Sequence, residues 1–178
     1  IETDNGRLDY DYLLLALGTE SNYFGLDNVK HHALPMKTIN DALNLRNHLL
    51  LNMEQAIRSK DPREQAKMLN IVIAGGGPTG VEIAGMLAEM SANIGAKEYP
   101  ELKQKNNIYL IDAAPTLLGP MSVTAQKEAE KILGRLGVHI ILNTAVKDYK
   151  DGAVILANGK SIPTHSLIWT SGVTARSV

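Results

Sequence analysis

Three glycines with the spacing G-x-G-x-x-G, at Gly75, Gly77 and Gly80, are the strongest chemical signal in the sequence. In this pattern the first glycine permits a tight turn, the second lets a pyrophosphate approach the backbone, and the third lets a helix pack closely against a strand. The N–H groups and the positive dipole end of that helix then face the phosphates. A dinucleotide site is therefore predicted, with a structural glycine turn as the alternative. The residues assigned to the cofactor are Gly75, Gly76, Gly77, Pro78, Thr79 and Gly80.

Asp112 is the second candidate, because it ends an apolar run that reads as the next strand, 108–112. A carboxylate at this place in a βαβ unit binds the ribose hydroxyls, and it repels a 2′-phosphate, so it favours NAD over NADP. The separation from Gly80 is 112 − 80 = 32 residues, longer than the roughly 20 that are usual. An insertion at 91–106 can absorb the excess. The alternative is an ordinary aspartate that starts a turn.

Glu82 is expected in the first turn of the helix that follows the glycines. There an acid is stabilised by the helix dipole, or it faces the nicotinamide end of a bound cofactor; the sequence leaves both open. Trp169 is expected to pack in the core. The adjacent His31 and His32 are interpreted as part of a solvated loop, and no metal site is predicted.

Composition narrows the class of protein. The 178 residues suffice for one core, the absence of cysteine excludes disulfides and thiol nucleophiles from this chain, and a net charge of −1 gives no electrostatic argument for nucleic acid. No apolar run approaches the roughly 18 residues of a membrane-spanning helix, and a cytoplasmic location is expected. The chain begins with Ile1, and we expect it to be a piece of a longer protein.

The elements that must position these residues follow from periodicity. An apolar run after Asn70 predicts the central strand, and its crossover helix should reach about Ile94, which makes a parallel βαβ unit. Helices are predicted from Thr38 or Asn40 to Arg58 and over 123–136, the latter capped by Ser122 and ended by Gly137. The further expectations are a hairpin at Asn5-Gly6, a buried strand over 10–19 with Tyr10 and Tyr12 as packing residues, a loop over 20–36, a polar break over 60–64 and a strand over 138–142.

Towards the carboxyl end the period changes to two. Short strands over 145–149, 153–156 and 161–162 are joined by Asp151-Gly152 and Asn158-Gly159, which are strong hairpin turns. The predicted fold class is therefore α/β, a Rossmann-like βαβ parallel sheet with a three-stranded antiparallel β-meander. A last apolar run, 166–172, follows.

Two apolar runs that end in small residues bracket this pattern, at Ala16-Leu17-Gly18-Thr19 and at residues 167–172. With the glycine sequence that ends at Glu82, the chain resembles the two-dinucleotide-binding-domain flavoproteins, and most closely the type II NADH dehydrogenases. The resemblance implies a remnant of an FAD-binding domain over 1–34, an NAD(H)-binding domain over 35–165 and a return strand to the FAD-binding domain over 166–178.

That family passes a hydride from NADH to FAD and two electrons on to quinone. The resemblance implies that Gly75, Gly77, Gly80 and Asp112 hold NAD(H), and that Glu82 lies between nicotinamide and flavin as a catalytic residue. At the two crossovers the cofactor-binding residues would be Gly18, Thr19, Ser171 and Gly172. The cofactors implied are NAD(H) and, in the parent protein, FAD. The partners implied are NADH and a quinone or other acceptor. A homodimer is one expected assembly, and the parent protein is expected to be peripheral to the membrane, on its cytoplasmic face.

The sequence departs from the family at several points. It lacks the FAD fingerprint and the C-terminal Gly-Asp flavin motif, and Leu17 replaces the threonine of the usual A-T-G signature. The chain alone is therefore expected to bind NADH without turnover. Three alternatives remain: the NAD(P)H-binding domain of a disulfide or ferredoxin reductase, a non-catalytic nucleotide-sensing module, and an FAD site at the glycines, which the preceding strand and helix disfavour.

Overall fold

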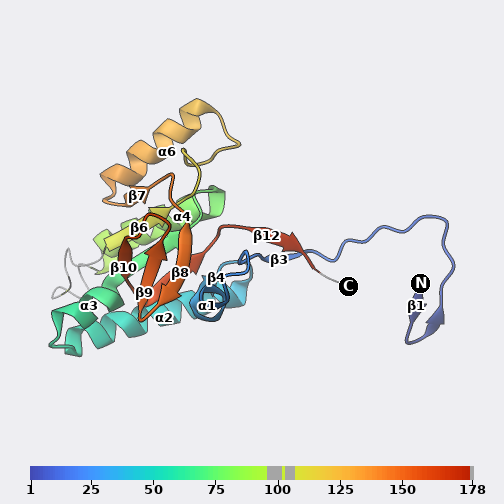
Figure 1. Ribbon diagram of the computed structural model, residues 1–178, viewed down its shortest axis with the longest axis horizontal. Coiled ribbons are helices and arrows are strands. Elements are labelled where there is room, and N and C mark those ends of the chain that lie inside the picture. The colour runs from blue at the N-terminus through green and yellow to red at the C-terminus, as the bar shows by residue number, and fades with distance from the viewer. Residues whose placement is uncertain (96–101, 103–106, 177–178) are drawn as a thin grey trace.

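A five-stranded parallel sheet runs through the computed structural model, which describes residues 1–95, 102 and 107–176 (Figure 1). Every neighbouring pair in this sheet is parallel. In spatial order the strands are β4 (Leu34–Pro35), β11 (Ser166–Trp169), β5 (Asn70–Ala74), β6 (Asn107–Ile111) and β7 (His139–Ile141). The predicted parallel βαβ unit is confirmed, with β5 and β6 joined through α4 (Pro78–Met90).

The central strand β5 is buried along its whole length, which explains its continuous apolar sequence. Its side chains alternate between the two faces of the sheet. Ile71 and Ile73 pack into one core, whereas Val72 and Ala74 pack into the other. Both faces of the sheet are therefore covered by packed side chains, and the carboxyl ends of its strands are where a ligand can bind.

Helices cover the face to which Ile73 points. Leucines of α2 (Ile39–Arg58) and α4 and Leu133 of α6 (Val123–Arg135) join the core there. The predicted cap Ser122 is present on α6, and Gly137 follows that helix with φ +83°. Thr38, one of the two predicted starts of α2, is its N-cap. Both of these predicted helices are thereby confirmed.

The other face is covered by the predicted meander. Its strands are antiparallel, β8 (Val146–Lys150), β9 (Ala153–Leu156) and β10 (Ser161–Pro163), and their apolar side chains pack against β5 and β11 together with Val29 of α1 (Asp27–His32). Asp151 and Gly152 both have positive φ, as the hairpin turn requires. Trp169 is buried here and stacks on Tyr23, which confirms its packing role.

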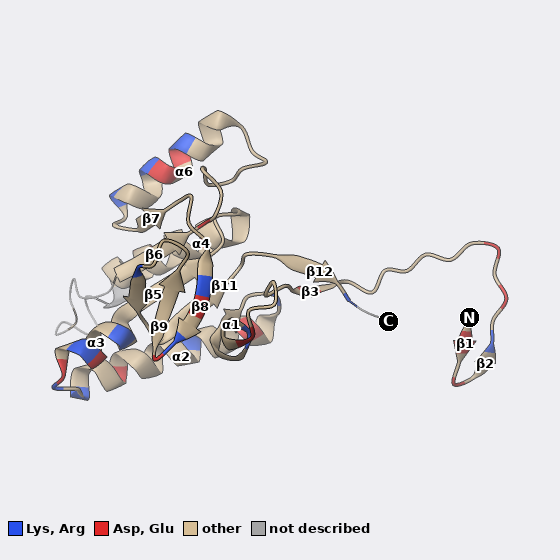
Figure 2. Cartoon of the chain, viewed as in Figure 1, with Lys and Arg blue, Asp and Glu red and all other residues tan. Residues whose placement is uncertain are grey.

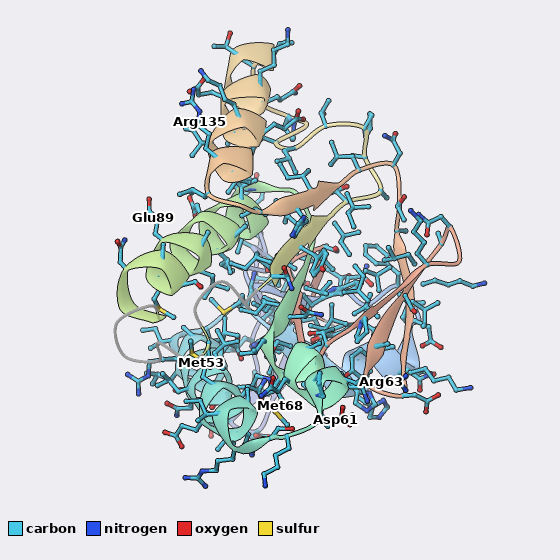
Figure 3. The ribbon with its side chains drawn as sticks, turned by 90° about the vertical axis from the view of Figure 1, so that its left-hand side faces the viewer. Met53, Asp61, Arg63, Met68, Glu89 and Arg135 are labelled. Atoms are coloured by element: carbon cyan, nitrogen blue, oxygen red, sulfur yellow. The ribbon has the colours of Figure 1, made fainter. Side chains whose placement is uncertain are left out.

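A helix occupies part of the region predicted as a polar break. Asp61 accepts a hydrogen bond from the N–H of Arg63 and caps α3 (Pro62–Leu69), whose first residue is Pro62. Proline is suited to this first position, so here it starts a helix in addition to ending the previous one. Below the sheet Met53 of α2 and Met68 of α3 pack against one small core (Figure 3).

The prediction of a buried strand over residues 10–19 is wrong. Tyr12 and Leu14 are 96% and 90% exposed, and among the described residues no strand pairs with 10–18. Tyr10 is exposed as well, so neither it nor Tyr12 packs. An apolar run becomes a buried strand only where neighbouring strands and a covering layer exist, and this segment runs away from the body (Figure 1). The predicted hairpin is confirmed as β1 (Glu2–Thr3) and β2 (Gly6–Arg7), but its turn is Asp4-Asn5 and not Asn5-Gly6, because Gly6 already pairs with Thr3.

The prediction of a loop over residues 20–36 is also wrong in part, since α1 and β4 lie there. At its start, β3 (Thr19–Ser21) pairs antiparallel with β12 (Val173–Ala175), outside the large sheet. We call this pair the connecting ribbon; it projects from the body (Figure 1). The chain thus enters and leaves the α/β body through adjacent strands.

The crossover after α4 continues as one π-helical turn, Ser91–Gly95. The rest of the predicted insertion, 96–101 and 103–106, lies outside the described residues. Leu102 is buried against Ala56 and Leu69.

Charges of both signs share the outer helices. On α6, lysines and an arginine lie among glutamates (Figure 2), so that helix offers no surface of a single sign. Among the helices of the described chain, none is long and apolar enough to cross a membrane.

At the amino edge of the sheet His48 belongs to a half-buried polar cluster. Its Nε2 lies 3.1 Å from the carbonyl oxygen of His165 and 3.2 Å from Oγ of Ser166, and Asn52 donates to the same hydroxyl. Burial lowers the pKa of His48, the hydrogen bond to the His165 carbonyl opposes this, and the His165 ring adds to it.

This shift predicts a pH dependence of stability. The unfolded chain takes up a proton on His48 near pH 6.5, before the folded chain does. The contribution of neutral His48 to stability is therefore complete above that pH and is lost as the pH falls from it towards the lower pKa of the folded chain. Urea unfolding at pH 7.5 and 5.5 should show a smaller loss for His48→Gln than for the unaltered chain. His31→Gln, on exposed α1, is the control; an equal loss in all three proteins would contradict the prediction.

Candidate dinucleotide site

The glycine turn between β5 and α4 lies at the carboxyl edge of the sheet, as predicted. Gly75 has φ +117°, and a Cβ there would lie 2.7 Å from Oγ1 of Thr170. A Cβ at Gly80 would lie 1.8 Å from the carbonyl oxygen of Gly75. The tight turn at the first glycine and the close packing at the third are therefore confirmed.

Gly77 faces open space, because no atom lies within 4 Å of the position that its Cβ would take. It is the N-cap of α4, and no side chain caps this helix end. Pro78 follows as the first helical residue. The positive end of the α4 dipole and the open backbone are what a pyrophosphate requires.

Gly77→Ala should separate binding from folding. Its φ of −74° suits alanine, so the fold should lose at most about 1 kcal/mol through the poorer N-cap. The added methyl group would stand where the phosphate of the expected dinucleotide approaches, so the affinity for NADH, the expected ligand, should fall about tenfold or more. Thermal unfolding and calorimetric titration measure the two effects; unchanged affinity in a folded variant would contradict the prediction.

Asp112 binds the backbone on both of its sides. Its Oδ2 accepts a hydrogen bond from the N–H of Gly76, and its Oδ1 accepts one from the N–H of Ala114 at 2.7 Å. A carboxylate offers about four acceptor positions, so each oxygen keeps one for a ribose hydroxyl. The residue thus also braces the glycine turn, which sequence spacing does not reveal.

A cavity of about 480 Å³ lies beside Asp112, between the carboxyl edge of the sheet and the start of β8. Ala74, Asp112 and Ser171 bring the ends of β5, β6 and β11 to its wall, and Thr144 to Lys147 form another side. Its size is within the range of small-ligand pockets. Ligands in open α/β sheets bind at this edge, where the strand order changes direction.

Two further residues shape the site and were missed by sequence reasoning. Thr170 packs behind the glycine turn, and Phe24 lines the cavity with its ring tilted over Trp169. Phe24 has φ +51°, and its N–H donates to Oδ1 of Asn22. Asn22, three residues before Gly25, is a turn signal, but nothing in that signal points to the cavity.

Glu82 does not lie in the first turn of α4, where it was predicted. The helix begins at Pro78, so Glu82 is its fifth residue and no acid lies in the first turn. The expectation of a first-turn acid is therefore wrong, and the dipole argument falls with it. Glu82 is exposed and does not line the cavity beside Asp112. Its catalytic role stays a prediction.

The crossover residues are only partly brought together. Ser171 lines the cavity, and Gly172 accepts a hydrogen bond from the N–H of Asn22. Thr19 lies on the connecting ribbon beside a second cavity of about 520 Å³. The carbonyl oxygen of Gly18 accepts a hydrogen bond from the N–H of Arg176 at 3.3 Å. Cofactor contacts of these residues stay predictions.

His31 and His32 each place Nδ1 2.7 Å from a backbone oxygen of α1, and His32 stacks on Tyr149. Over the described part of the chain, no group of three metal-ligating side chains is found.

A parallel sheet whose central strand leads through a glycine turn into a helix is the fold of a dinucleotide-binding α/β domain. The family model of the pyridine nucleotide-disulphide oxidoreductases matches residues 1–178. The chain belongs to this family.

Its relatives include type II NADH:quinone oxidoreductases. The Ndh protein of Mycobacterium tuberculosis, which bears that name, is 37% identical over 171 residues, covering 93% of this chain and 37% of the relative. The mitochondrial external NADH-ubiquinone oxidoreductase 2 of Saccharomyces cerevisiae is 34% identical, covering 93% of this chain and 31% of its own length. The chain thus spans about a third of the length of these curated relatives.

Among solved structures, NDH2 from Plasmodium falciparum in complex with NADH superposes with a TM-score of 0.87 at 27% identity, covering 95% of this chain and 36% of that one. Putidaredoxin reductase, at 21% identity and a TM-score of 0.66, shares the fold alone.

Proposed function

We propose that this chain is the NADH-binding unit of a flavin-dependent NADH dehydrogenase, which passes a hydride from NADH to FAD and electrons on to quinone. One observation carries the proposal: the glycine turn that opens its backbone at Gly77 is hydrogen-bonded, through the N–H of Gly76, to the carboxylate of Asp112 at the end of β6, so both lie at the carboxyl edge of the sheet. The first suits a pyrophosphate and the second suits the ribose of adenosine. The reaction class is taken from the NADH:quinone oxidoreductases to which the chain is similar, and from NDH2 of Plasmodium falciparum, whose structure holds NADH.

The residues present fit a dinucleotide. The uncapped start of α4 supplies N–H donors and a positive dipole end, and the neighbouring cavity has room for a planar base against Thr144 and Val146. The chain's own residues then bind and orient the nucleotide: Gly77 receives the pyrophosphate and Asp112 fixes the ribose. Gly18, Thr19, Ser171 and Gly172 are proposed to lie towards the flavin, with Glu82 beside the nicotinamide.

FAD, when bound in the parent protein, supplies the hydride acceptor. The domain division at 34/35 and 165/166 stays a prediction, and the strand pairing favours a second boundary after Trp169. β11 pairs with β5 inside the large sheet, whereas β12 pairs with β3 in the connecting ribbon. The chain therefore passes from one sheet to the other between Trp169 and Val173, close to the residues assigned to the crossover. The similarity to NADH:quinone oxidoreductases supports three further parts of the proposal. They are quinone as the electron acceptor, a parent protein bound to the cytoplasmic face of a membrane, and a homodimer.

Calorimetric titration of the chain with NADH and NADPH tests the assignment. NADH should bind, and NADPH should bind about tenfold or more weakly, because its 2′-phosphate would approach the Asp112 carboxylate. Tighter binding of NADPH, or binding of neither nucleotide, would overturn it. Adding FAD during the titration should produce no oxidation of NADH, since turnover is assigned to the complete parent.

A further inference from the structure

Thr170 stands directly behind the glycine turn. β11 pairs in register with β5, Trp169 opposite Ala74, so the next residue on β11 lies opposite Gly75. The N–H of Thr170 donates to the carbonyl oxygen of Ala74 at 2.8 Å. Its hydroxyl lies 2.9 Å from the same oxygen and 3.1 Å from that of Gly75, so its single proton is shared between these two carbonyl oxygens.

The hydroxyl also fills the space that two glycines leave. A Cβ at Gly75 would lie 2.7 Å from Oγ1 of Thr170, and one at Gly80 would lie 2.9 Å from it. The first and third glycines of the pattern therefore both pack on this side chain. Turn and threonine are complementary in shape as well as in hydrogen bonding.

Two successive peptide groups are held at both ends. In the first, the backbone N–H of Thr170 donates to the carbonyl of Ala74, and the N–H of Gly75 donates to the carbonyl of Ile111, each at 2.8 Å. In the second, the hydroxyl of Thr170 donates to the carbonyl of Gly75, and the N–H of Gly76 donates to Asp112. Because a peptide group is planar, fixing both of its ends fixes its orientation. The path of the chain into Gly77 follows from these two planes.

We propose that Thr170 is a positioning residue for the pyrophosphate of the dinucleotide, acting through the glycine turn; this rests on the proposed binding of NADH. It sets the two peptide planes that aim Gly77 and the start of α4 at the phosphates. The adenosine end, which Asp112 holds, does not depend on the hydroxyl in the same way, since the contact of Asp112 with Ala114 lies on the other side.

The test compares Thr170→Ser with Thr170→Ala, which differ from one another by the hydroxyl alone, and adds Thr170→Val, which keeps the shape. Calorimetry measures NADH and ADP-ribose, NMR titration measures adenosine, and thermal unfolding is recorded for each variant. The serine variant should bind NADH with an affinity within about twofold of that of the unaltered chain. The alanine and valine variants should bind NADH and ADP-ribose about tenfold more weakly, whereas their affinity for adenosine should not change.

Equal NADH affinity in the serine and alanine variants would overturn the proposal, as would a loss of the same factor for adenosine and NADH, which marks a purely structural role. If the valine variant does not fold, the serine and alanine pair decides. A failure of the unaltered chain to bind NADH overturns the proposed function along with this inference, whereas normal binding by the unaltered chain and by the alanine variant overturns the inference alone.

Discussion

Gly80→Ala is expected to lower the free energy of unfolding by about 3 kcal/mol and to abolish NADH binding. The new Cβ would lie 1.8 Å from the carbonyl oxygen of Gly75. That atom belongs to the backbone, so either the start of α4 or the glycine turn must move. For a chain of this length the loss corresponds to a fall of about 6–12 °C in the midpoint of thermal unfolding. Circular dichroism measures the midpoint, and calorimetry measures the binding.

Gly134→Ala is the matched control. Gly134 lies in the exposed part of α6, and no atom lies within 4 Å of its Cβ position. Alanine is favoured over glycine inside a helix by roughly 0.5–1 kcal/mol, so this variant should be slightly more stable and should bind NADH normally. A Gly80→Ala protein that unfolds and binds like the unaltered chain would show that the close packing has no energetic weight.

Asp112→Asn is expected to weaken NADH binding about tenfold and to reduce the preference over NADPH. Both carboxylate oxygens accept a backbone N–H, from Gly76 and from Ala114. An asparagine has one acceptor oxygen, so one of these N–H groups would face an amide donor, at a cost of about 1–3 kcal/mol in stability. The loss of the negative charge removes the repulsion of a 2′-phosphate. Titration with both nucleotides gives the ratio of affinities.

Replacing an exposed aspartate by asparagine is the control, because it removes the same charge away from the glycine turn. Asp9 is largely exposed and lies near Arg7 at 3.7 Å, far along the chain from the glycine turn. Asp9→Asn should alter neither the unfolding midpoint nor the ratio of affinities. An unchanged ratio in the Asp112→Asn protein would remove Asp112 from the nucleotide site.

The glycine turn was predictable because its determinants are local. Gly75, Gly77 and Gly80 lie close together in the sequence, and the apolar run before them and the helical pattern after them supplied the context that the spacing needs. Asp112 required only the next strand. Thr170 was not predictable, because it reaches the turn through the pairing of β11 with β5, and the chain between them is long.

The wrong expectations have physical reasons of the same kind. The run from Tyr10 to Thr19 has the sequence of a buried strand, but a sequence pattern indicates a preference for burial and not the surface that provides it. The helix after Asp61 had a local signal, an N-cap followed by proline, which the interpretation as a break overlooked. Glu82 was misplaced by the uncertainty of where a helix begins.

The connecting ribbon has a mechanical consequence. Thr19–Ser21 and Val173–Ala175 are hydrogen-bonded to each other, so both ends of the α/β body are held at one place. The two connections of the body therefore leave it side by side, as one paired ribbon. Trp169 donates its indole N–H to the carbonyl of Asn22, at the base of this ribbon. The base of the ribbon is thereby tied to β11, the strand that also lies beside β5 and the glycine turn.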